Sequence, residues 1–302
     1  MRLHVVGNIC LDTTFGLRHL PQPGETVNGR LTAEGLGGKG ANQAVAAARV
    51  GADVRFHAAI GSDAVAEQLI LTLVQDLSTQ DLVRTENATD RSTILVDQAG
   101  ENVVISAVAC ATAFDPRENL APHLRAGDTL LMQGNLSPEV TQACLARAKR
   151  CGLYTIFNPS PLGEQTVIDF SSVDLLIANR TEAATLAATP DMATAIAKLV
   201  QLGAAGVIVT LGADGCLVQE TADAAPLHIA GLTVEARDTS GAGDCFAGTI
   251  AGLLSLAKPL TPAIAVAMEA AALAVCRHGT VASFPSRAEM AALLTKFELE
   301  RP

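Results

Sequence analysis

The feature that most restricts the fold of this chain is the regular alternation, from residue 128 onward, of short apolar segments with segments of helical periodicity. The apolar segments lie at 128–132, 153–157, 173–177 and 206–210, and the helical segments at 138–151, 181–188 and 192–202. A strand of continuous apolar residues is covered on both faces, and strands that alternate with helices pair in parallel. The pattern therefore predicts an α/β fold in which a mainly parallel sheet carries helices on both faces.

The first third of the chain adds a second kind of pattern. The expected order is a strand at 3–7, a helix at 41–50 closed by Gly51, a strand at 53–60 and a helix at 63–76. Two polar, alternating stretches interrupt it, PQPGETVNGRLTAEG at 21–35 and STILVDQAGENVVISAV at 92–108, and both are typical of hairpins. We expect the two hairpins to combine into one small sheet beside the main body, formed by residues 9–35 and 91–112.

The rest of the chain indicates a single domain over residues 1–302. After residue 241 it is mainly helical, at 243–256, 261–276 and 286–296, and it shows no internal repeat and no low-complexity linker. Hydrophobic residues make up 49% of the chain and charged residues 17%, which is enough apolar material for a large core. In such a fold, ligands bind beyond the carboxyl ends of the strands, where the strand order reverses.

Charge and cysteine usage exclude several classes of function. A net charge of −10 argues against nucleic acid or an anionic membrane as the main partner. No signal peptide is evident, and no apolar run approaches the roughly 18 residues of a membrane-spanning helix, so we expect a cytoplasmic protein. The seven cysteines show no Cys-x-x-Cys pair and are expected to be reduced, the six histidines show no metal spacing, and no Gly-x-Ser-x-Gly hydrolase motif is present.

The first candidate motif is the glycine-rich segment from Gly35 to Gln43. Gly35, Gly37 and Gly40 match the dinucleotide pattern G-x-G-x-x-G, but a hairpin separates them from the first strand, so an NAD-dependent dehydrogenase is disfavoured. Gly40 after Lys39 also rules out a Walker A loop. A cation and the Asn42 amide at the start of a helix suit a polyhydroxyl ligand, and the alternative is a structural turn with a surface lysine.

The second candidate motif is the segment from Asp238 to Asp244, which leads directly into a helix. First-turn N–H groups have no partner within a helix, so Gly241, Ala242 and Gly243 could form an anion site for a transferred phosphoryl group. A carboxylate there repels phosphate, and its presence is explained if Asp244 accepts the proton of an attacking hydroxyl. The alternative is an aspartate that caps the helix.

Two further loops follow predicted strands. Asn179-Arg180-Thr181-Glu182 follows the strand at 173–177, and Thr210-Leu211-Gly212 follows the strand at 206–210. Glu182 could organise magnesium and its waters, but the residues alone favour a capping role, with Thr181 as the N-cap and Glu182 in the first turn. Thr210 and Gly212 are candidates for a nucleotide-contacting turn.

Two long segments resemble the signatures of the ribokinase, or phosphofructokinase-B, family of carbohydrate kinases. They are GGKGANQAVAAARVG at 37–51 and DTSGAGDCFAGTIAGLL at 238–254, supported by IGSD at 60–63, FNPSP at 157–161, NRTE at 179–182 and VTLGADG at 209–215. The resemblance covers nearly the whole chain. It implies a ribokinase-like three-layer α/β/α sandwich with a β-sheet lid, and lid-to-lid homodimers.

The resemblance also implies a role for each matching residue. The sugar would be held by Asp12, Gly38, Lys39, Asn42, Asn135 and Asp244, and the anion hole would be formed by Gly241, Ala242 and Gly243. Asn179 and Glu182 would serve Mg²⁺ and phosphate, and Thr210 and Gly212 would line the ATP site. A potassium ion would lie beside the anion hole at Asp238, Ser240, Arg277, Gly279 and Ser283, partly through main-chain oxygens.

Two departures from the family pattern leave the sugar open. This chain has Cys110-Ala111-Thr112 where members usually have Gly-Ala-Asn, and Gly134-Asn135 where they usually place a glutamate near the sugar. The expected reaction is transfer of the ATP γ-phosphoryl group to a primary hydroxyl of a pentose, D-ribose giving D-ribose 5-phosphate. Deoxyribose, a fructose-type sugar or a nucleoside stay open as substrates, and a non-catalytic sugar-binding regulator is a further alternative.

Overall fold

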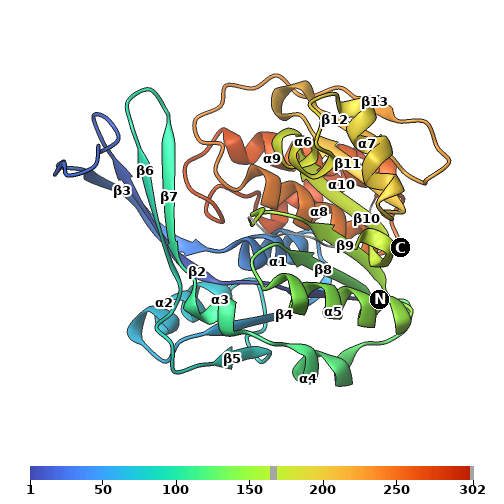
Figure 1. The fold of residues 1–302 in the computed structure, drawn as a ribbon, viewed down its shortest axis with the longest axis horizontal. Helices are drawn as coiled ribbons and strands as arrows, with labels where there is room; N and C mark the ends of the chain where they lie inside the picture. The colour runs from blue at the N-terminus through green and yellow to red at the C-terminus, as the bar shows by residue number, and fades with distance from the viewer. Residues whose placement is uncertain (164–168, 300–302) are drawn as a thin grey trace.

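The computed structural model describes residues 1–163 and 169–299, and its centre is a mainly parallel sheet (Figure 1). Within these residues the sheet has nine strands in the order β13-β12-β11-β10-β9-β8-β1-β4-β5. Their bounds are β1 (Arg2–Val6), β4 (Asp53–Ile60), β5 (Leu82–Arg84), β8 (Thr129–Gln133), β9 (Tyr154–Asn158), β10 (Leu175–Asn179), β11 (Gly206–Thr210), β12 (Cys216–Gln219) and β13 (Leu227–Ile229). The parallel sheet predicted from the apolar segments is confirmed.

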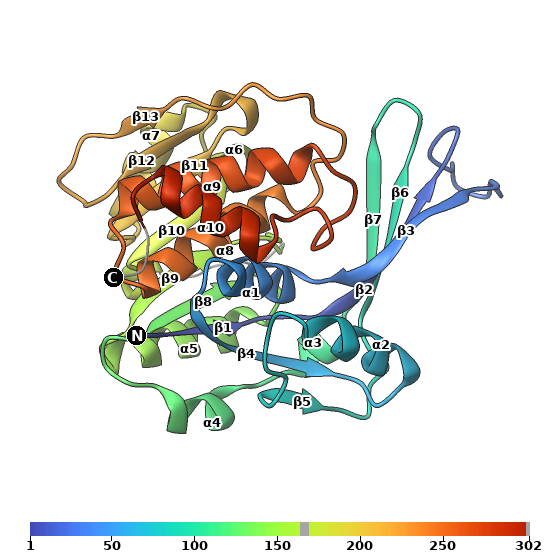
Figure 2. The ribbon, with the colours of Figure 1, turned by 180° about the vertical axis from the view of Figure 1, so that it is seen from behind.

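Helices cover both faces of this sheet (Figure 2). One hydrophobic cluster joins the sheet to α1 (Lys39–Arg49), α2 (Ala64–Leu73), α8 (Ala242–Ser255), α9 (Leu260–Val275) and α10 (Arg287–Lys296). A second cluster joins the opposite face to α3 (Ala109–Ala113), α4 (Arg117–Leu120), α5 (Pro138–Arg150), α6 (Arg180–Ala187) and α7 (Met192–Gln201). Side chains alternate along each strand, so Leu131 of β8 enters the first cluster while Leu130 and Met132 enter the second.

Beside this body lies a small sheet with the strand order β3-β2-β6-β7. It is built from the hairpin of β2 (Cys10–Gly16) with β3 (Arg30–Gly37) and the hairpin of β6 (Arg91–Val96) with β7 (Asn102–Ala107). Strands β2 and β6 pair in parallel and join the two hairpins, which are far apart in the sequence. The expectation that both hairpins form one sheet is confirmed. The first hairpin is nevertheless built from Cys10–Gly16 and Arg30–Gly37 and not within 21–35, because residues 17–29 form no strand. The sheet extends away from the helices (Figures 1 and 2).

Acidic side chains fix the base of the small sheet to the body. Asp63 caps α2 by accepting from the N–H of Ala66, and it also accepts from the N–H and the hydroxyl of Thr89, which precedes β6. The hydrogen bond from the Thr89 hydroxyl is the main cause that lowers the pKa of Asp63 to about 2. Asp90 accepts from the N–H groups of Cys110 and Ala111 at the start of α3. Both carboxylates therefore hold backbone in place.

The sequence did not predict the antiparallel edge of the main sheet or the three-residue strand β5. Strand β12 pairs antiparallel with both β11 and β13, and β13 is short and largely exposed. Such strands carry neither a continuous apolar run nor a full alternation, so their sequence resembles that of a loop. In the described part of the chain, no helix is both long enough and apolar enough to cross a membrane.

Strand order in the main sheet reverses between β1 and β8. From β1 the chain passes first to β4 on one side, and it later returns to place β8 on the other side of β1. At such a reversal the connecting segments leave in opposite directions and open a crevice at the carboxyl ends of the strands. The fold therefore places the predicted site beyond the carboxyl ends of β1 and β8.

Two buried histidines should make the fold sensitive to mild acid. His4 of β1 is fully buried and His57 of β4 nearly so, with 3.1 Å between Nδ1 of His4 and Nε2 of His57. Burial lowers the pKa of His4 to about 4 and that of His57 to about 3, against an ordinary value of 6.5. The unfolded chain therefore binds protons that the folded chain excludes. Above about pH 6.5 the two imidazoles are neutral in both states and do not lower the stability of the fold. As the pH falls toward 4 the unfolded chain becomes protonated first, and the free energy of unfolding decreases.

We predict that, for each buried imidazole, the free energy of unfolding falls by about 2 kcal/mol when the pH is lowered from 7.5 to 5. Urea unfolding across this range should show the loss in the wild type and a shallower dependence in a His4→Asn/His57→Asn double variant. The control is His19→Asn, because the side chain of His19 is 57% exposed. An equal pH dependence in the wild type and the double variant would contradict the prediction.

Candidate active site

The starts of helices α1 and α8 meet at one carboxylate. Asp244 is the third residue of α8 and is buried, with 6% of its surface exposed. Its Oδ2 accepts from Nδ2 of Asn42 and its Oδ1 from Nε2 of Gln43, each at 2.9 Å. The structure thus brings the glycine-lysine segment and the second motif to the same place, although about two hundred residues separate them in the sequence.

Asp244 does not cap its own helix. The N-cap of α8 is Gly241, which adopts a left-handed conformation with φ 75°, and no side chain caps the helix. The capping alternative for Asp244 is therefore wrong: its side chain points toward α1. The N–H of Ala242 donates to the main-chain oxygen of Thr239, whereas those of Gly243 and Asp244 have no acceptor within the described residues. The first turn of α8 therefore keeps free N–H donors beside a buried carboxylate, an arrangement that suits a phosphoryl group.

The predicted sugar-binding residues of the small sheet and α1 share this neighbourhood. Gly38 is the N-cap of α1 with φ 93°, and Lys39 begins the helix. Burial is the main cause that raises the pKa of Asp12 in β2; the charge of Asp244 raises it further and that of Lys39 lowers it. These effects place the charges of Asp12, Lys39 and Asp244 within electrostatic reach of one another.

Two of the predicted sugar-binding residues carry a buried acceptor that lacks a donor. Oδ1 of Asn42 and Oδ1 of Asn135 are buried, and neither accepts a hydrogen bond within the described residues. Asn135 follows β8, at the reversal of strand order. Buried carbonyl oxygens of amides are nearly always satisfied, and a hydroxyl group of a ligand would satisfy both.

The sequence analysis assigned no role to several polar residues that complete the site. Gln43, Gln133 at the end of β8 and Asn158 at the end of β9 form a buried chain of amides behind Asp244. Sγ of Cys10 lies 3.2 Å from Oδ1 of Asp12. A polar residue at the carboxyl end of an otherwise apolar strand, as in TLLMQ and YTIFN, is the sequence pattern that could have indicated Gln133 and Asn158. This pattern does not show which residues they bind.

The second group of predicted residues lies on neighbouring strand ends. Asn179 and Thr210 are paired in register at the ends of β10 and β11. Asn179 caps α6 in a reciprocal box: its Oδ1 accepts from the N–H of Glu182 at 2.8 Å, and Oε2 of Glu182 accepts from the N–H of Asn179 at 2.9 Å. Helix α6 begins at Arg180, so the prediction of Thr181 as N-cap is wrong, because Asn179, two residues earlier, is the N-cap and already satisfies the third N–H of the helix. Gly212 is exposed, with φ 64°.

The predicted potassium ligands gather in the loop after α9 and the loop before α8. The carboxylate of Asp238 accepts from the N–H groups of Ser240 and Gly279, both at 2.9 Å. The hydroxyl of Ser283 is buried and donates to the main-chain oxygen of Thr280. The guanidinium of Arg277 pairs with Glu289 and has only donors, so Arg277 can offer an ion nothing but its main-chain oxygen.

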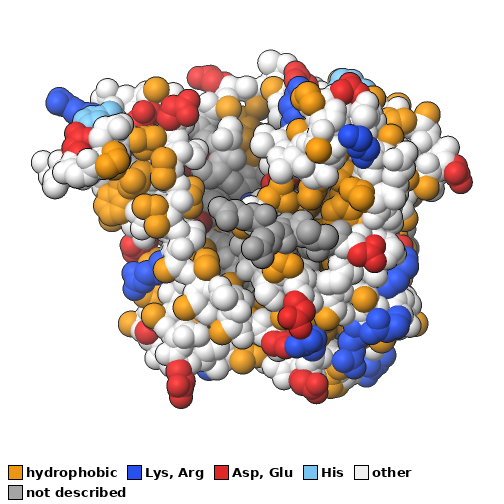
Figure 3. Space-filling model, in the orientation of Figure 1, with side chains coloured by type: hydrophobic (Ala, Val, Ile, Leu, Met, Phe, Trp, Pro, Cys, Tyr) orange, Lys and Arg blue, Asp and Glu red, His pale blue; other side chains and the backbone are white. Residues whose placement is uncertain are grey.

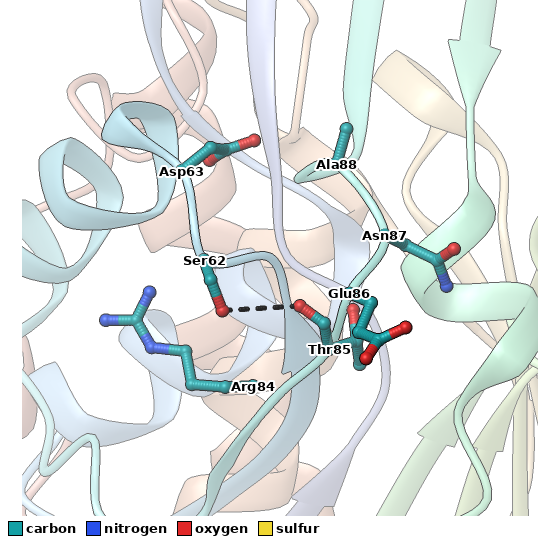
Figure 4. Close-up of a pocket in the computed structure, with 7 residues that line it drawn as sticks. All are labelled: Ser62, Asp63, Arg84, Thr85, Glu86, Asn87 and Ala88. Atoms are coloured by element: carbon teal, nitrogen blue, oxygen red, sulfur yellow. Dashed lines mark hydrogen bonds between the residues drawn. The ribbon is translucent and has the colours of Figure 1, made fainter.

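The described residues contain no cluster of side chains for a divalent metal ion, and a surface pocket of the protein lies away from this region. Among the described residues no three His, Cys, Asp or Glu side chains gather as a metal site. A pocket of about 610 Å³ between α2 and the base of the small sheet is lined by Ser62, Asp63, Arg84, Thr85, Glu86, Asn87 and Ala88 (Figure 4). None of the predicted site residues lines this pocket, and the carboxylate of Asp63 already accepts hydrogen bonds from main-chain N–H groups.

Comparisons with known proteins identify the family. A family model described as pfkB family carbohydrate kinase matches residues 2–287. The chain belongs to this family. It is 33% identical over 299 residues to the ribokinase of Mus musculus, covering 95% of this chain and 92% of the relative. It is 28% identical over 296 residues to the deoxyribokinase of Salmonella typhimurium, covering 95% and 96%. The ribokinase structure from Thermotoga maritima matches with a TM-score of 0.86 at 30% identity, covering 98% of this chain and 99% of that one.

Family membership confirms the expected ribokinase-like three-layer fold and the expected reaction class. As a pfkB family carbohydrate kinase, the protein is a phosphotransferase with an alcohol group as acceptor. The dehydrogenase alternative is thereby rejected. The structure gives the physical reason, since Gly35 and Gly37 lie in an antiparallel strand of the small sheet and not in a β–α turn of the main sheet.

We predict that Gly37→Ala weakens sugar binding. A Cβ at residue 37 would lie 2.0 Å from Oδ2 of Asp12, so the carboxylate would have to move. Loss of a hydrogen bond to a charged group should raise the KM for the sugar by about 10- to 100-fold while the KM for ATP stays close to that of the wild type. Gly35→Ala, in the same strand, is the matched control because its Cβ would meet nothing within 4 Å. Equal sugar KM values for both variants would refute the prediction.

Proposed function

We propose that this protein transfers the γ-phosphoryl group of ATP to a primary hydroxyl of a pentose, converting D-ribose to D-ribose 5-phosphate. The observation that carries the proposal is the buried carboxylate of Asp244, held by two amide donors beside free N–H groups of the first turn of α8. The similarity to ribokinases over nearly the full chain supports the choice of sugar.

Asp244 would act as the general base. Its two hydrogen bonds leave each carboxylate oxygen a further lone pair, with which it can accept the proton of the attacking hydroxyl. The N–H groups of Gly243 and Asp244 would donate to the oxygens of the transferred phosphoryl group as charge develops on them. Gly241 and Ala242 would shape the turn, with the N–H of Ala242 already bonded to Thr239.

The sugar would be oriented by acceptors and one cation. Asp12, Asn42 and Asn135 offer oxygens to its hydroxyl groups, Lys39 offers donors, and Gly38 allows close approach of the backbone. In place of a carboxylate, Asn135 presents one acceptor and one donor group, which keeps deoxyribose and other sugars in question. Cys110 bears less on the choice, because its N–H binds Asp90 and its thiol lies 3.2 Å from the main-chain oxygen of Ala88, at the base of the small sheet.

The nucleotide would bind beyond β10 and β11, where Thr210 and Gly212 line the turn and Asn179 and Glu182 face the phosphates. Magnesium, when bound with ATP, supplies positive charge that bridges phosphate oxygens. Glu182 fits an indirect role toward that ion, because one carboxylate oxygen is used in the capping box and the other is left for a water. Potassium beside Asp238, Ser240, Arg277, Gly279 and Ser283 would add fixed positive charge near the start of α8.

The small sheet would act as a lid that excludes water from the site, with strands β2 and β3 bringing Asp12 and Gly38 to the sugar. Exclusion of water limits the wasteful hydrolysis of ATP and strengthens the electrostatic interactions within the site. The cytoplasm, where ATP is made, is the expected compartment.

The test is ADP release with a panel of D-ribose, deoxyribose, fructose, adenosine and pseudouridine. We expect the highest kcat/KM with D-ribose, and Asp244→Asn should lower kcat by roughly 10²–10⁴-fold while sugar binding persists. Preference for another panel member would replace ribose as the substrate. Sugar binding in calorimetry without turnover of any member would support the non-catalytic regulator, and wild-type turnover by Asp244→Asn would refute the assigned base.

We also propose a homodimer through the small sheet. Strand β7 is its edge and all six of its residues are exposed, including Val103 at 43%, Val104 at 54% and Ile105 at 62%. Apolar side chains gather on the small sheet at the upper left of Figure 3. An exposed apolar edge strand is a template for pairing with another chain, and a second copy of this sheet is its natural partner.

Sedimentation velocity at micromolar concentration should show a dimer for the wild type and a monomer for Ile105→Lys. Leu71→Lys is the control, because Leu71 is a similarly exposed apolar residue, at 69%, that lies in α2 and not on the edge strand of the small sheet. A monomeric wild type would count against the proposed dimer.

A further inference from the structure

A chain of buried amides links Asp244 to the centre of the main sheet. Nδ2 of Asn158 donates to the main-chain oxygen of Ile177 in β10 at 2.8 Å. Nε2 of Gln43 donates to Oδ1 of Asn158 at 3.0 Å and to Oδ1 of Asp244 at 2.9 Å. Oε1 of Gln43 accepts from Nε2 of Gln133 at 2.9 Å. The proposed base is therefore connected through α1 to β8, β9 and β10.

These amides are too deeply buried to be a surface feature. Gln43 and Gln133 are fully buried, and Asn158 has 9% of its surface exposed. Burying amide groups in an α/β core is unfavourable unless they are bonded, and Oε1 of Gln133 accepts no hydrogen bond within the described residues. An apolar residue at position 133 would avoid this unsatisfied acceptor. The network therefore lowers the stability of the fold, and close packing alone gives no reason for its presence.

The orientation of the amides in this network is set by a group that can only accept a hydrogen bond. The main-chain oxygen of Ile177 can only accept, so Asn158 must turn its NH₂ toward Ile177 and its Oδ1 toward Gln43. Gln43 must then present its NH₂ to Asn158, and the same NH₂ reaches Asp244. Asp244 consequently receives donors from both Gln43 and Asn42 and faces no acceptor from this network. Two charge-assisted hydrogen bonds fix the rotamer of the Asp244 carboxylate.

We propose that Gln43 is a positioning residue for Asp244 and that Asn158 sets the direction of the Gln43 amide. In this arrangement Gln43 holds the carboxylate of Asp244 in the orientation in which it accepts the proton of the sugar hydroxyl, without touching the sugar or ATP. The inference rests on the proposed role of Asp244 as base, and adds to it the group that prepares that base before the sugar binds.

The test compares Gln43→Met, which keeps the length of the side chain and removes the amide, with the wild type. We expect kcat to fall by about 10- to 100-fold while the KM values for sugar and ATP change by less than about 3-fold, because one hydrogen bond to a charged group is lost. Gln43→Glu should lower kcat further, because it places a second carboxylate against Asp244.

Two controls separate positioning from loss of structure. Gln68→Met replaces an exposed glutamine of α2 and should keep the wild-type kcat and KM values. Asn158→Leu removes the acceptor that orients Gln43 without altering α1, and it should lower kcat with little change in either KM, as Gln43→Met does. If Gln43→Met does not fold, as judged by circular dichroism and thermal unfolding, the Asn158→Leu result decides.

The outcomes distinguish the inference from the proposed function. An inactive Asp244→Asn together with a fully active Gln43→Met would overturn the inference alone. Wild-type turnover by Asp244→Asn would overturn both. A sugar KM that rises as much as kcat falls would show that Gln43 binds substrate or supports the fold, and would also overturn the positioning role.

Discussion

The close contact between α1 and α8 is the constraint on which the site depends. A Cβ on Gly248 would lie 2.3 Å from the main-chain oxygen of Gln43, so only glycine lets the two helices approach this closely. Because they do, the side chains of Asn42 and Gln43 reach the carboxylate of Asp244 one turn earlier on α8. Any residue that widened the contact would draw both donors away from the acid. The proposed chemistry therefore depends on the close packing of α1 against α8.

The strand order of the main sheet separates the two sites that the proposed reaction needs. The sugar would lie at β1, β8 and the small sheet, where Asp12, Asn42 and Asn135 would present oxygens, and the nucleotide would lie at the ends of β10 and β11. Strand β9 lies between them and supplies Asn158, which touches neither side but fixes the amide behind the base. A base placed between acceptor and donor sites is what direct transfer between two bound ligands requires.

Sequence patterns predicted what depends on local physics. Continuous apolar runs predicted the parallel strands, alternation with turn residues predicted both hairpins, and the glycine segment before a helix predicted the free N–H groups at the start of α8. The amide chain escaped prediction because residues 43, 133, 158 and 244 come together only through tertiary packing, and each alone resembles an ordinary polar residue. Thr181 was wrongly expected to cap α6 because a threonine and an asparagine two positions apart carry the same capping signal.

The acidic side chains around the carboxyl ends of the strands fall into two groups, and the division points to the reacting groups. Asp63, Asp90, Glu182 and Asp238 each accept from main-chain N–H groups and thereby hold loops and helix starts in place. Asp12 and Asp244 receive hydrogen bonds only from side chains, a thiol in one case and two amides in the other. A carboxylate that holds backbone cannot change its protonation without loosening the fold, whereas one held by side chains can. Asp12 and Asp244 are therefore the two acids that we propose to face the sugar.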